Sequence, residues 1–426
     1  GETKRMMKKN LILFFFICFS ANCFAQPAYY LIYDRDKSEK MGAEDILTIN
    51  RAFAQWQDNF MIPQINDNKG FFNRTLAVSY RLGKTVIIDN VWNDLIRVVQ
   101  HEVFGHGARL RETGYTKNKY NLTFPSPWFG GGGTAYYGKR EAGRMYTNTE
   151  AISYRFGGVE SNTIMANAIR TKWLASGKIY YRETYNYYRA FHNLTRYILN
   201  SANDEADMIN DMFSYTRALS IEYVVPLAES PLQIEDLKKK AIINYFNPLQ
   251  YLALYALVKG YIWEGNTEME LPMLNVGNWK YLPLVRMGLT PFGTEVYLEH
   301  FLKFRETLHL IQTRHGDGIF DKSCGMAYSN NRLIDNNWLW LQGEFNLWNQ
   351  PGYELGGDVV NTSGEGLGGA FQLGAHLKII RKANAANIFL MAGYKTAGYL
   401  EGEPLAGGLL LRFGLSFVQN KNHQIE

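Results

Sequence analysis

The stretch that decides the fold is Asn90 to Gly114, NVWNDLIRVVQHEVFGHGARLRETG. Apolar residues recur along it at helical spacing, Asp89 or Asn90 can cap its start, and Gly114 occupies the place of a C-terminal cap. We therefore expect one helix. Its centre, HEVFGH from His101 to His106, puts two imidazoles and one carboxylate among apolar residues. Two neutral imidazoles that bind Zn²⁺, with Glu102 as the base for a water molecule, would account for all three side chains.

The spacing of the two histidines is unusual for a zinc helix. In the common motif the histidines stand at positions i and i+4 on one helical face, whereas His101 and His106 stand five positions apart. At 3.6 residues per turn, this separates them by roughly 140° around a regular α-helix. One turn of π-helix would bring the rings together, and such bulges favour functional sites. Gly105, just before the second histidine, is the residue that tolerates the distortion.

The H-E-x-x-G-H pattern resembles the zinc motif of the dipeptidyl peptidase III family of metallopeptidases. The resemblance covers His101 to His106 and the distance to one acidic residue. It implies that the extra residue is accommodated in the helix and that a glutamate from a separate helix completes the ligands. Glu160 lies at a comparable distance along the chain. The family's second motif is rich in glutamate, and here the pair Gly157-Gly158 replaces its leading acidic residues.

Alternatives remain for the third ligand and for the histidines themselves. Glu160 falls at the expected start of a helix, where a carboxylate is stable beside the helix dipole without any metal. Glu150 and Glu141 are competing ligands, and His192 is a weaker one. A buried histidine can also be a satisfied core residue, and short motifs occur by chance. The sequence favours Glu160 as the partner of the two histidines.

The beginning of the chain predicts export. Lys8 and Lys9 precede an apolar run from Leu11 to Phe19, and residues 1–25 are expected to be a secretory signal peptide. Without them, the totals of 45 basic and 40 acidic side chains fall to 41 and 39. The remaining charge is close to balanced and argues against a nucleic-acid partner. Cys324 is then the one cysteine left, so no internal disulfide is expected.

Residues 26–275 are expected to form a mainly helical domain. Glu44 to Met61 is amphipathic, whereas Arg74 to Asp89 contains extended runs that predict strand next to the metal helix. The run Pro125 to Gly133 is rich in proline and glycine and predicts a loop, either on the surface or as a flap over the cleft. Ala241 to Trp263 is apolar but interrupted by polar residues, so we expect a buried helix pair there, with an interfacial helix as the alternative.

Residues 276–418 have a different pattern, and residues 419–426 would be a tail. Hydrophobic residues alternate with other residues in segments such as Phe371 to Ile379 and Leu409 to Phe417, separated by turns rich in Gly, Asn and Asp. Such strands, together with export and an aromatic content of 15%, predict an outer-membrane β-barrel of about eight strands. A soluble β-sandwich or a ligand-holding barrel is the alternative.

Together these features predict an α+β protein, with a mainly helical, zincin-like N-terminal domain followed by an antiparallel β-barrel. The expected function is that of an exported zinc-dependent hydrolase, most simply a metallopeptidase associated with the outer membrane of a Gram-negative bacterium, with the periplasm as the alternative location. Glu102 is the expected catalytic base, Zn²⁺ the cofactor, and a peptide or protein the substrate. The alternative is a barrel that binds or passes a ligand, with a His/Glu cluster that is structural or binds metal without turnover.

Overall fold

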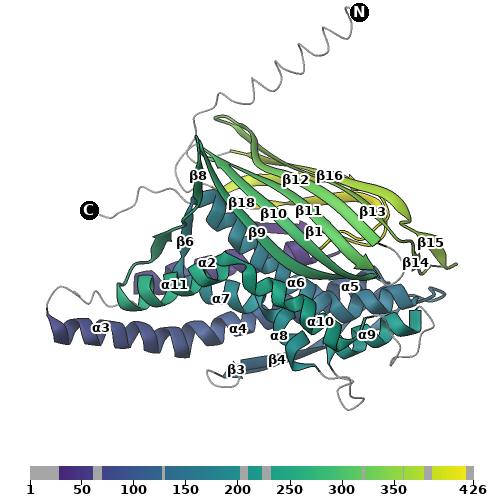
Figure 1. Cartoon of the computed structure of the whole chain (residues 1–426), viewed down its shortest axis with the longest axis horizontal. Helices are drawn as coiled ribbons and strands as arrows, with labels where there is room; N and C mark the ends of the chain where they lie inside the picture. The colour runs from purple at the N-terminus through teal and green to yellow at the C-terminus, as the bar shows by residue number, and fades with distance from the viewer. Residues whose placement is uncertain are drawn as a thin grey trace, which may run out of the picture.

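The computed structural model describes residues 28–60, 70–126, 130–201, 210–222, 232–318, 322–357, 359–378 and 386–418. The expected signal peptide and C-terminal tail lie outside these ranges. Within them, one large antiparallel sheet lies over a layer of helices (Figure 1). This mixture of helices and antiparallel strands confirms the expected α+β composition.

The longest helix is α6 (Asn148–Ser176), which begins with a capping box between Thr147 and Glu150 and ends at Gly177, whose φ is 74°. Of the helices described, none combines the length and hydropathy needed to cross a membrane. Further helices are α2 (Glu39–Phe60), α3 (Phe71–Lys84), the π-helix η1 (Thr85–Asp89), α4 (Asn90–Val99), the π-helix η2 (Gln100–His106), α5 (Gly107–Glu112), α7 (Tyr181–Phe191), α8 (Asn193–Asn200), α9 (Asp211–Glu222), α10 (Ile234–Ala241), the 3₁₀-helix η5 (Ile242–Phe246), α11 (Pro248–Tyr255) and the π-helix η6 (Ala256–Trp263).

The large sheet has ten strands. They are β1 (Ala28–Asp34), β8 (Leu274–Val276), β9 (Trp279–Thr290), β10 (Gly293–Phe304), β11 (Thr307–Gly318), β12 (Lys322–Asp335), β13 (Leu339–Gln350), β16 (Gly366–Leu377), β17 (Ala386–Lys395) and β18 (Gly408–Val418). Their order is β1-β18-β17-β16-β13-β12-β11-β10-β9-β8. The alternation after residue 276 therefore confirms its prediction of strands. The sheet also includes β1 from the N-terminal region, where Asp34 pairs with Arg412 of β18.

Four small sheets of two strands each occur elsewhere in the described chain. They pair β2 (Tyr115–Thr116) with β5 (Lys139–Arg140), β3 (Lys119–Ser126) with β4 (Gly130–Tyr136), β6 (Lys178–Tyr180) with β7 (Glu268–Glu270), and β14 (Tyr353–Leu355) with β15 (Asn361–Ser363).

The two faces of the large sheet differ in polarity. The face toward the helices holds buried charges: Arg286 pairs with Glu299 (3.1 Å) and Glu401 (2.7 Å), and Arg412 pairs with Glu403 (2.7 Å). The outer face is mostly apolar, which reverses the usual order of a soluble sheet over a hydrophobic core. Its exposed apolar residues include Leu31, Tyr33, Leu298, Ile311, Phe345, Leu367, Phe371, Leu373, Ile388, Leu390, Tyr394, Leu409, Leu411, Phe413 and Leu415.

The sheet is curved, but its described strands do not close into the expected barrel. β1 and β8 stand at opposite edges and do not pair with each other. Side chains from helices bond to the backbone at both sides of this gap. The N–H of Ile32 in β1 donates to Oδ1 of Asp45 in α2 (2.7 Å), and the N–H of Met287 in β9 donates to Oδ1 of Asn244 in η5 (2.8 Å). Helices therefore take part of the role that strand pairing has in a closed barrel.

The second half of α6 lies under the inner face of the sheet. Arg170 of α6 binds Glu299 of β10 through both terminal nitrogens, and Lys303 of β10 donates to the carbonyl of Ala175 (2.5 Å). Between α2, α6 and the sheet lies a cavity of about 360 Å³, lined by charged, amide and aromatic side chains. The first half of α6 packs against η2. One helix thus connects the sheet to the histidine pair.

Two local predictions are wrong. The segment Arg74 to Asp89 is helical rather than extended, and it forms most of α3 and all of η1. Leu76 and Leu82 are half exposed. A strand would need its alternate apolar residues buried in a core, and this segment has no such core. The run Gly130 to Gly133 lies in strand β4 rather than in a loop. Glycines can pair through their backbone alone, and here they pair with β3.

Candidate metal centre

A π-helical turn brings the two histidines together. The chain continues as one helical stretch through α4, η2 and α5, and all seven residues of η2 are π-helical. The ring centroids of His101 and His106 lie 4.9 Å apart, and both side chains are buried. The expected π turn is therefore confirmed, and it removes the angular separation that a regular helix would impose at this spacing.

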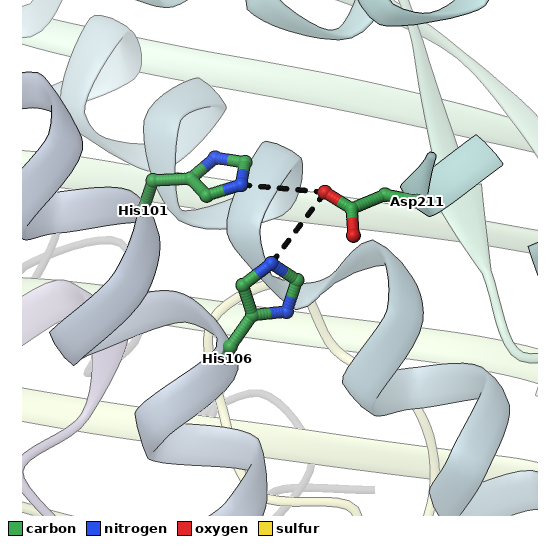
Figure 2. Close-up of side chains that lie close together, drawn as sticks. All are labelled: His101, His106 and Asp211. Carbon is green, nitrogen blue, oxygen red and sulfur yellow. Dashed lines mark ion pairs between the residues drawn. The ribbon is translucent and has the colours of Figure 1, made fainter. Parts of the chain in front are cut away.

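The carboxylate that reaches both imidazoles is Asp211, at the N-terminus of α9 (Figure 2). Its Oδ2 lies 3.4 Å from Nε2 of His101 and 3.5 Å from Nε2 of His106. The three residues form a group that could hold a metal ion, because their ligand atoms all lie within 4.8 Å of one another. The side chain of Asp211 remains 20% exposed, so the group is not sealed from solvent.

Glycines on the facing helix leave room beside the imidazoles. A Cβ on Gly158 of α6 would lie 2.6 Å from Nε2 of His106 and 2.5 Å from Cε1 of His101. A Cβ on Gly105 would lie 2.6 Å from the carbonyl oxygen of Gly157. The Gly157-Gly158 pair therefore allows η2 and α6 to pack closely, with both imidazoles against the backbone of Gly158.

Neighbouring groups on α6 orient both rings. Nδ1 of His106 lies 2.7 Å from the carbonyl oxygen of Tyr154, which can only accept, so this nitrogen carries the proton and Nε2 is the ligand atom of the neutral ring. Nδ1 of His101 lies 3.1 Å from the side-chain amide of Asn162. The ring of Tyr197 stacks on His101 with centroids 5.5 Å apart. These contacts direct both Nε2 atoms toward Asp211.

The facing atoms fit a metal ion. Nε2 of His101 is buried and makes no hydrogen bond within the described structure. Nε2 of neutral His106 and a carboxylate oxygen both present lone pairs, so a cation, either a proton or a metal ion, must lie between them. The side-chain nitrogen of Asn162 can only donate to Nδ1 of His101, so Nε2 of neutral His101 carries a proton that a metal ion would have to displace. Charge-assisted hydrogen bonds of this kind are about 2.7–2.9 Å long. Zinc bonds of about 2.0–2.1 Å in a tetrahedral site place ligand atoms about 3.3–3.4 Å apart, close to the two distances seen here.

The electrostatics of the group are dominated by the carboxylate. Burial alone would lower the pKa of His106, but the charge of Asp211 outweighs it and raises that pKa to about 9. Burial would likewise raise the pKa of Asp211, yet His106 and His101 hold it well below its usual range. Without a metal, a proton on His106 is therefore the cation that balances Asp211 at neutral pH.

Glu102 lies next to this group and beside the glycine-rich strand. β4 runs alongside α4 and η2, and a Cβ on Gly133 would lie 2.9 Å from Oε1 of Glu102. The strand comes this close because it carries no side chain at that position. Glu102 is 5% exposed and makes no side-chain hydrogen bond or ion pair among the residues that the structure describes, although its charge also raises the pKa of His106.

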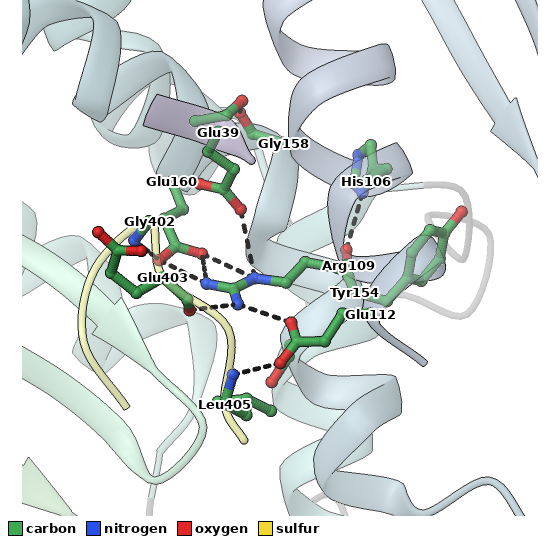
Figure 3. Close-up of polar contacts among 12 residues, drawn as sticks. Glu39, His106, Arg109, Glu112, Tyr154, Gly158, Glu160, Gly402, Glu403 and Leu405 are labelled. Carbon is green, nitrogen blue, oxygen red and sulfur yellow. Dashed lines mark hydrogen bonds and ion pairs between the residues drawn. The ribbon is translucent and has the colours of Figure 1, made fainter. Parts of the chain in front are cut away.

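The structure places Glu160, the expected third ligand, in a different cluster (Figure 3). α6 begins twelve residues before it, so Glu160 lies in the middle of that helix rather than at its start. Its carboxylate accepts from Nη2 of Arg109 (2.7 and 2.8 Å), from the N–H of Gly402 (3.0 Å) and from the hydroxyl of Tyr399 (3.1 Å). With these donors satisfied, Glu160 is not part of the group around the imidazoles, and Asp211 takes that place.

Arg109 binds two more carboxylates in the same cluster. Its Nε lies 3.2 Å from Glu39, and its Nη1 lies 3.0 Å from Glu112. Nη1 also donates to the carbonyl of Glu403, just before β18 (3.1 Å). Burial raises the pKa of Glu39 well above its usual range, and the charge of Glu160 raises it further. The cluster attaches the metal helix to the end of the sheet.

The competing ligands of the sequence are also elsewhere. Glu150 pairs with Arg144 and caps the start of α6. Glu141 is exposed just after β5. His192, at the end of α7, contacts the side-chain amide of Gln250 through Nε2. The described structure brings none of the three into the group of potential ligands.

Sequence reasoning missed Asp211. It stands 105 positions after His106, in a segment with several other acidic residues, and no local spacing distinguishes it. Its role depends on the packing of α9 against α6, which a linear pattern does not encode.

No family model, no curated protein and no solved structure matches this chain.

Proposed function

We propose that the protein is an exported zinc-dependent hydrolase that cleaves peptide bonds, with Asp211 in the role first expected of Glu160. The observation that carries this proposal is the convergence of His101, His106 and Asp211 directly beside Glu102. Two imidazoles and one carboxylate leave a fourth position of a tetrahedral zinc site for water or substrate. The 20% exposure of the Asp211 side chain gives that position a path to solvent.

In the proposed mechanism, His101, His106 and Asp211 hold Zn²⁺, and Glu102 moves the proton. Bound Zn²⁺ supplies a Lewis acid and lowers the pKa of a coordinated water toward ~7. Glu102 accepts a proton from the attacking water and then donates it to the leaving amine. Its carboxylate suits both steps, because no described side chain competes for it.

The neighbouring strand supports a peptide as the substrate. β4 pairs with β3 along one edge, and its other edge is unpaired among the strands described. An extended peptide can add to such an edge through backbone hydrogen bonds. Because Gly133 brings β4 against Glu102, a peptide bound there would run past the catalytic base. This zincin-like use of an edge strand is part of the proposal.

The reversed polarity of the large sheet supports a location in the outer membrane. Apolar side chains cover its outer face, and ion pairs line its inner face, as in membrane-spanning strands. Open sheet edges are unfavourable in lipid unless protein covers them. Asp45 and Thr48 of α2 bond to the backbone of β1, and Asn244 bonds to that of β9, so helices provide such cover. We infer a barrel-like wall of strands that helices complete.

The substitution Glu102→Gln tests the catalytic role. Gln keeps the shape of the side chain but cannot accept the proton, so turnover should fall about 10²–10⁴-fold while zinc stays near one per chain. Cleavage of a peptide mixture, read by mass spectrometry, and elemental analysis of the same sample give both values. Glu141→Gln, at an exposed site, is the control and should leave both unchanged. Full activity of the wild-type protein after complete metal removal would contradict the proposal.

A binding function remains the second candidate, and the cavity of about 360 Å³ under the sheet favours it. Charged and amide side chains there suit a small polar ligand. A purified protein that loses its zinc on dialysis, cleaves no peptide and yet retains such a ligand would support this candidate over the hydrolase.

A further inference from the structure

An apolar surface on the helical layer is exposed and has no cover in the described structure. It consists of outward residues of α3, η1, η5, α11 and η6, and we call it the helical apolar face. Several of its members are highly exposed, with 87% for Phe71, 77% for Phe72, 72% for Phe246 and 58% for Val258. Its residues are Phe71, Phe72, Leu76, Leu82, Ile87, Ile242, Tyr245, Phe246, Tyr251, Tyr255, Val258 and Trp263.

This surface is too extensive to be incidental. From Ala241 to Trp263 the sequence contains one charged residue, Lys259, which pairs with Glu264 at the end of the segment. The expectation of a buried helix pair is thus correct for one side only, since Leu249 and Ala253 are fully buried while Tyr251 and Tyr255 are half exposed. Exposed apolar areas of this kind mark contact with a protein or a membrane.

Charge and aromatic content favour a membrane as the partner. α3 contains no acidic residue, and its Arg74 lies over the ring of Trp263 with 5.0 Å to the centroid. Arg81 donates to the carbonyl of Ile262 (2.9 Å), so α3 and η6 are joined side by side. Basic residues beside aromatic and aliphatic ones are typical of helices that lie in a lipid interface.

The helical apolar face also reaches the edge of the sheet. Asn244 of η5 accepts from the N–H of Met287 in β9, so this helical segment lies directly on the sheet edge. The neighbouring edge strand β8 exposes Leu274 (60%) and Val276 (57%). The helical apolar face therefore reaches the sheet at η5, and exposed apolar side chains also occur on the edge strand β8.

We propose that the helical apolar face binds the acyl chains of the same bilayer as the outer face of the sheet, with α3, α11 and η6 lying in the membrane interface. The inference rests on the membrane location in the proposed function and extends it to the helical layer. Lipid would then surround the protein on the side of α11 as well as on the side of the strands. The layer that contains the metal centre would sit at the membrane surface rather than free in solution, so membrane-associated polypeptides would reach it first.

Fluorophores at single cysteines test this placement. In a Cys324→Ser background of the full mature chain, Val258→Cys and Leu76→Cys report on the helical apolar face, and Leu390→Cys reports on the centre of the outer sheet face. Lys239→Cys on α10, where the lysine side chain is 77% exposed, is the aqueous control. Each labelled variant is reconstituted in vesicles of phosphatidylethanolamine and phosphatidylglycerol. Quenching by brominated acyl chains is compared with quenching by iodide.

The expected result is that labels at Val258, Leu76 and Leu390 are quenched by the brominated chains, and that the label at Lys239 is quenched by iodide. Lipid quenching at Leu390 but iodide quenching at Val258 and Leu76 would overturn this inference alone. Iodide quenching at Leu390 too would overturn the membrane location as well. A disulfide between two copies through Val258→Cys, with no lipid quenching, would assign the face to a second copy of the chain and overturn the inference.

Discussion

Two carboxylates near one helical stretch have opposite environments. Asp211 faces two imidazole nitrogens that can only be ligands or proton carriers, whereas Glu160 is saturated by Arg109, Tyr399 and a backbone N–H. The helix residues that receive them, His106 and Arg109, are three positions apart. The difference lies in the partner. A guanidinium with a fixed geometry neutralises the cluster around Glu160, whereas Asp211 faces two imidazoles that pack directly against Gly158.

This comparison shows how a metal centre differs from a structural ion pair. The planar guanidinium of Arg109 donates several hydrogen bonds in a fixed geometry. The carboxylates of Glu39, Glu112 and Glu160 are therefore paired without a further cation. Asp211 and Nε2 of neutral His106 contribute acceptors that face each other, so a proton or a metal ion must supply the attraction. The nature of the facing atoms, rather than burial or negative charge, therefore separates the two sites.

The largest expected effect is the loss of zinc affinity when Asp211 is replaced. Four-ligand zinc sites contribute about 10–16 kcal/mol, so Asp211→Ala should cost on the order of 4 kcal/mol, or about a thousand-fold in zinc affinity. Glu160→Gln is the matched control and should bind zinc as the wild type does. Competition with a zinc-binding dye measures both. Loss of zinc from Glu160→Gln, with normal binding by Asp211→Ala, would restore Glu160 as the ligand.

The next largest effect is the loss of stability when Arg109 is replaced in the cluster around Glu160. Arg109→Met leaves Glu39, Glu112 and Glu160 without their shared cation, and removing one partner of a buried pair should lower the free energy of unfolding by about 3 kcal/mol or more. The midpoint of urea denaturation measures this change. Arg109→Lys keeps the positive charge but loses the planar guanidinium. Its denaturation midpoint should therefore lie between those of the wild type and Arg109→Met. An unchanged midpoint for Arg109→Met would show that the cluster does not hold the helix to the sheet end.

A third, smaller effect concerns the space between the imidazoles. Gly158→Ala places a methyl group at both Nε2 atoms and should weaken zinc binding by about 10–100-fold, the range seen when groups that orient metal ligands are altered. Gly157→Ala is the neighbouring control, because its Cβ would meet the side chain of Arg109 instead. Equal zinc affinity for the two variants would show that Gly158 serves helix packing alone.

The smallest effect depends on pH. The pKa of Glu39 is raised in the folded protein, so the folded state holds a proton that the unfolded chain releases above a pKa of about 4.3. That contribution to stability is complete below the unfolded pKa and is lost as the pH rises toward the folded value, by at most about 1.4 kcal/mol per pH unit. Glu39→Gln should therefore gain stability relative to the wild type as the pH rises. Denaturation midpoints from pH 4 to 8 test this, and parallel curves would contradict it.

Features that repeat locally could be predicted from the sequence. His101, Glu102 and His106 lie within six residues, and their spacing alone required the π turn that η2 provides. Strands after Trp279 follow from the period of two along segments such as Phe371 to Leu377. In both cases the physical cause acts over one or two turns of helix or a few residues of strand.

Features that depend on distant packing could not be predicted. Asp211 reaches the imidazoles because α9 packs on α6. Glu160 of α6 does not reach them, because Arg109 of α5 pairs with its carboxylate. The open sheet likewise depends on Asp45 and Asn244, which are unremarkable in sequence but bond to strand edges. Leu76 to Leu82 became helix because its apolar residues had no core to face.

The long helix α6 has a mechanical consequence. Its 29 residues span about 43 Å. Gly158 contacts the imidazoles, and Arg170 forms an ion pair with Glu299 on the inner face of the sheet. Because this one helix packs against both the strands and the histidine turn, we expect the two regions to unfold together. A chain cut between residues 275 and 276 would leave the strands without the helix that fills their inner side, and each half would lose its fold together with its neighbour.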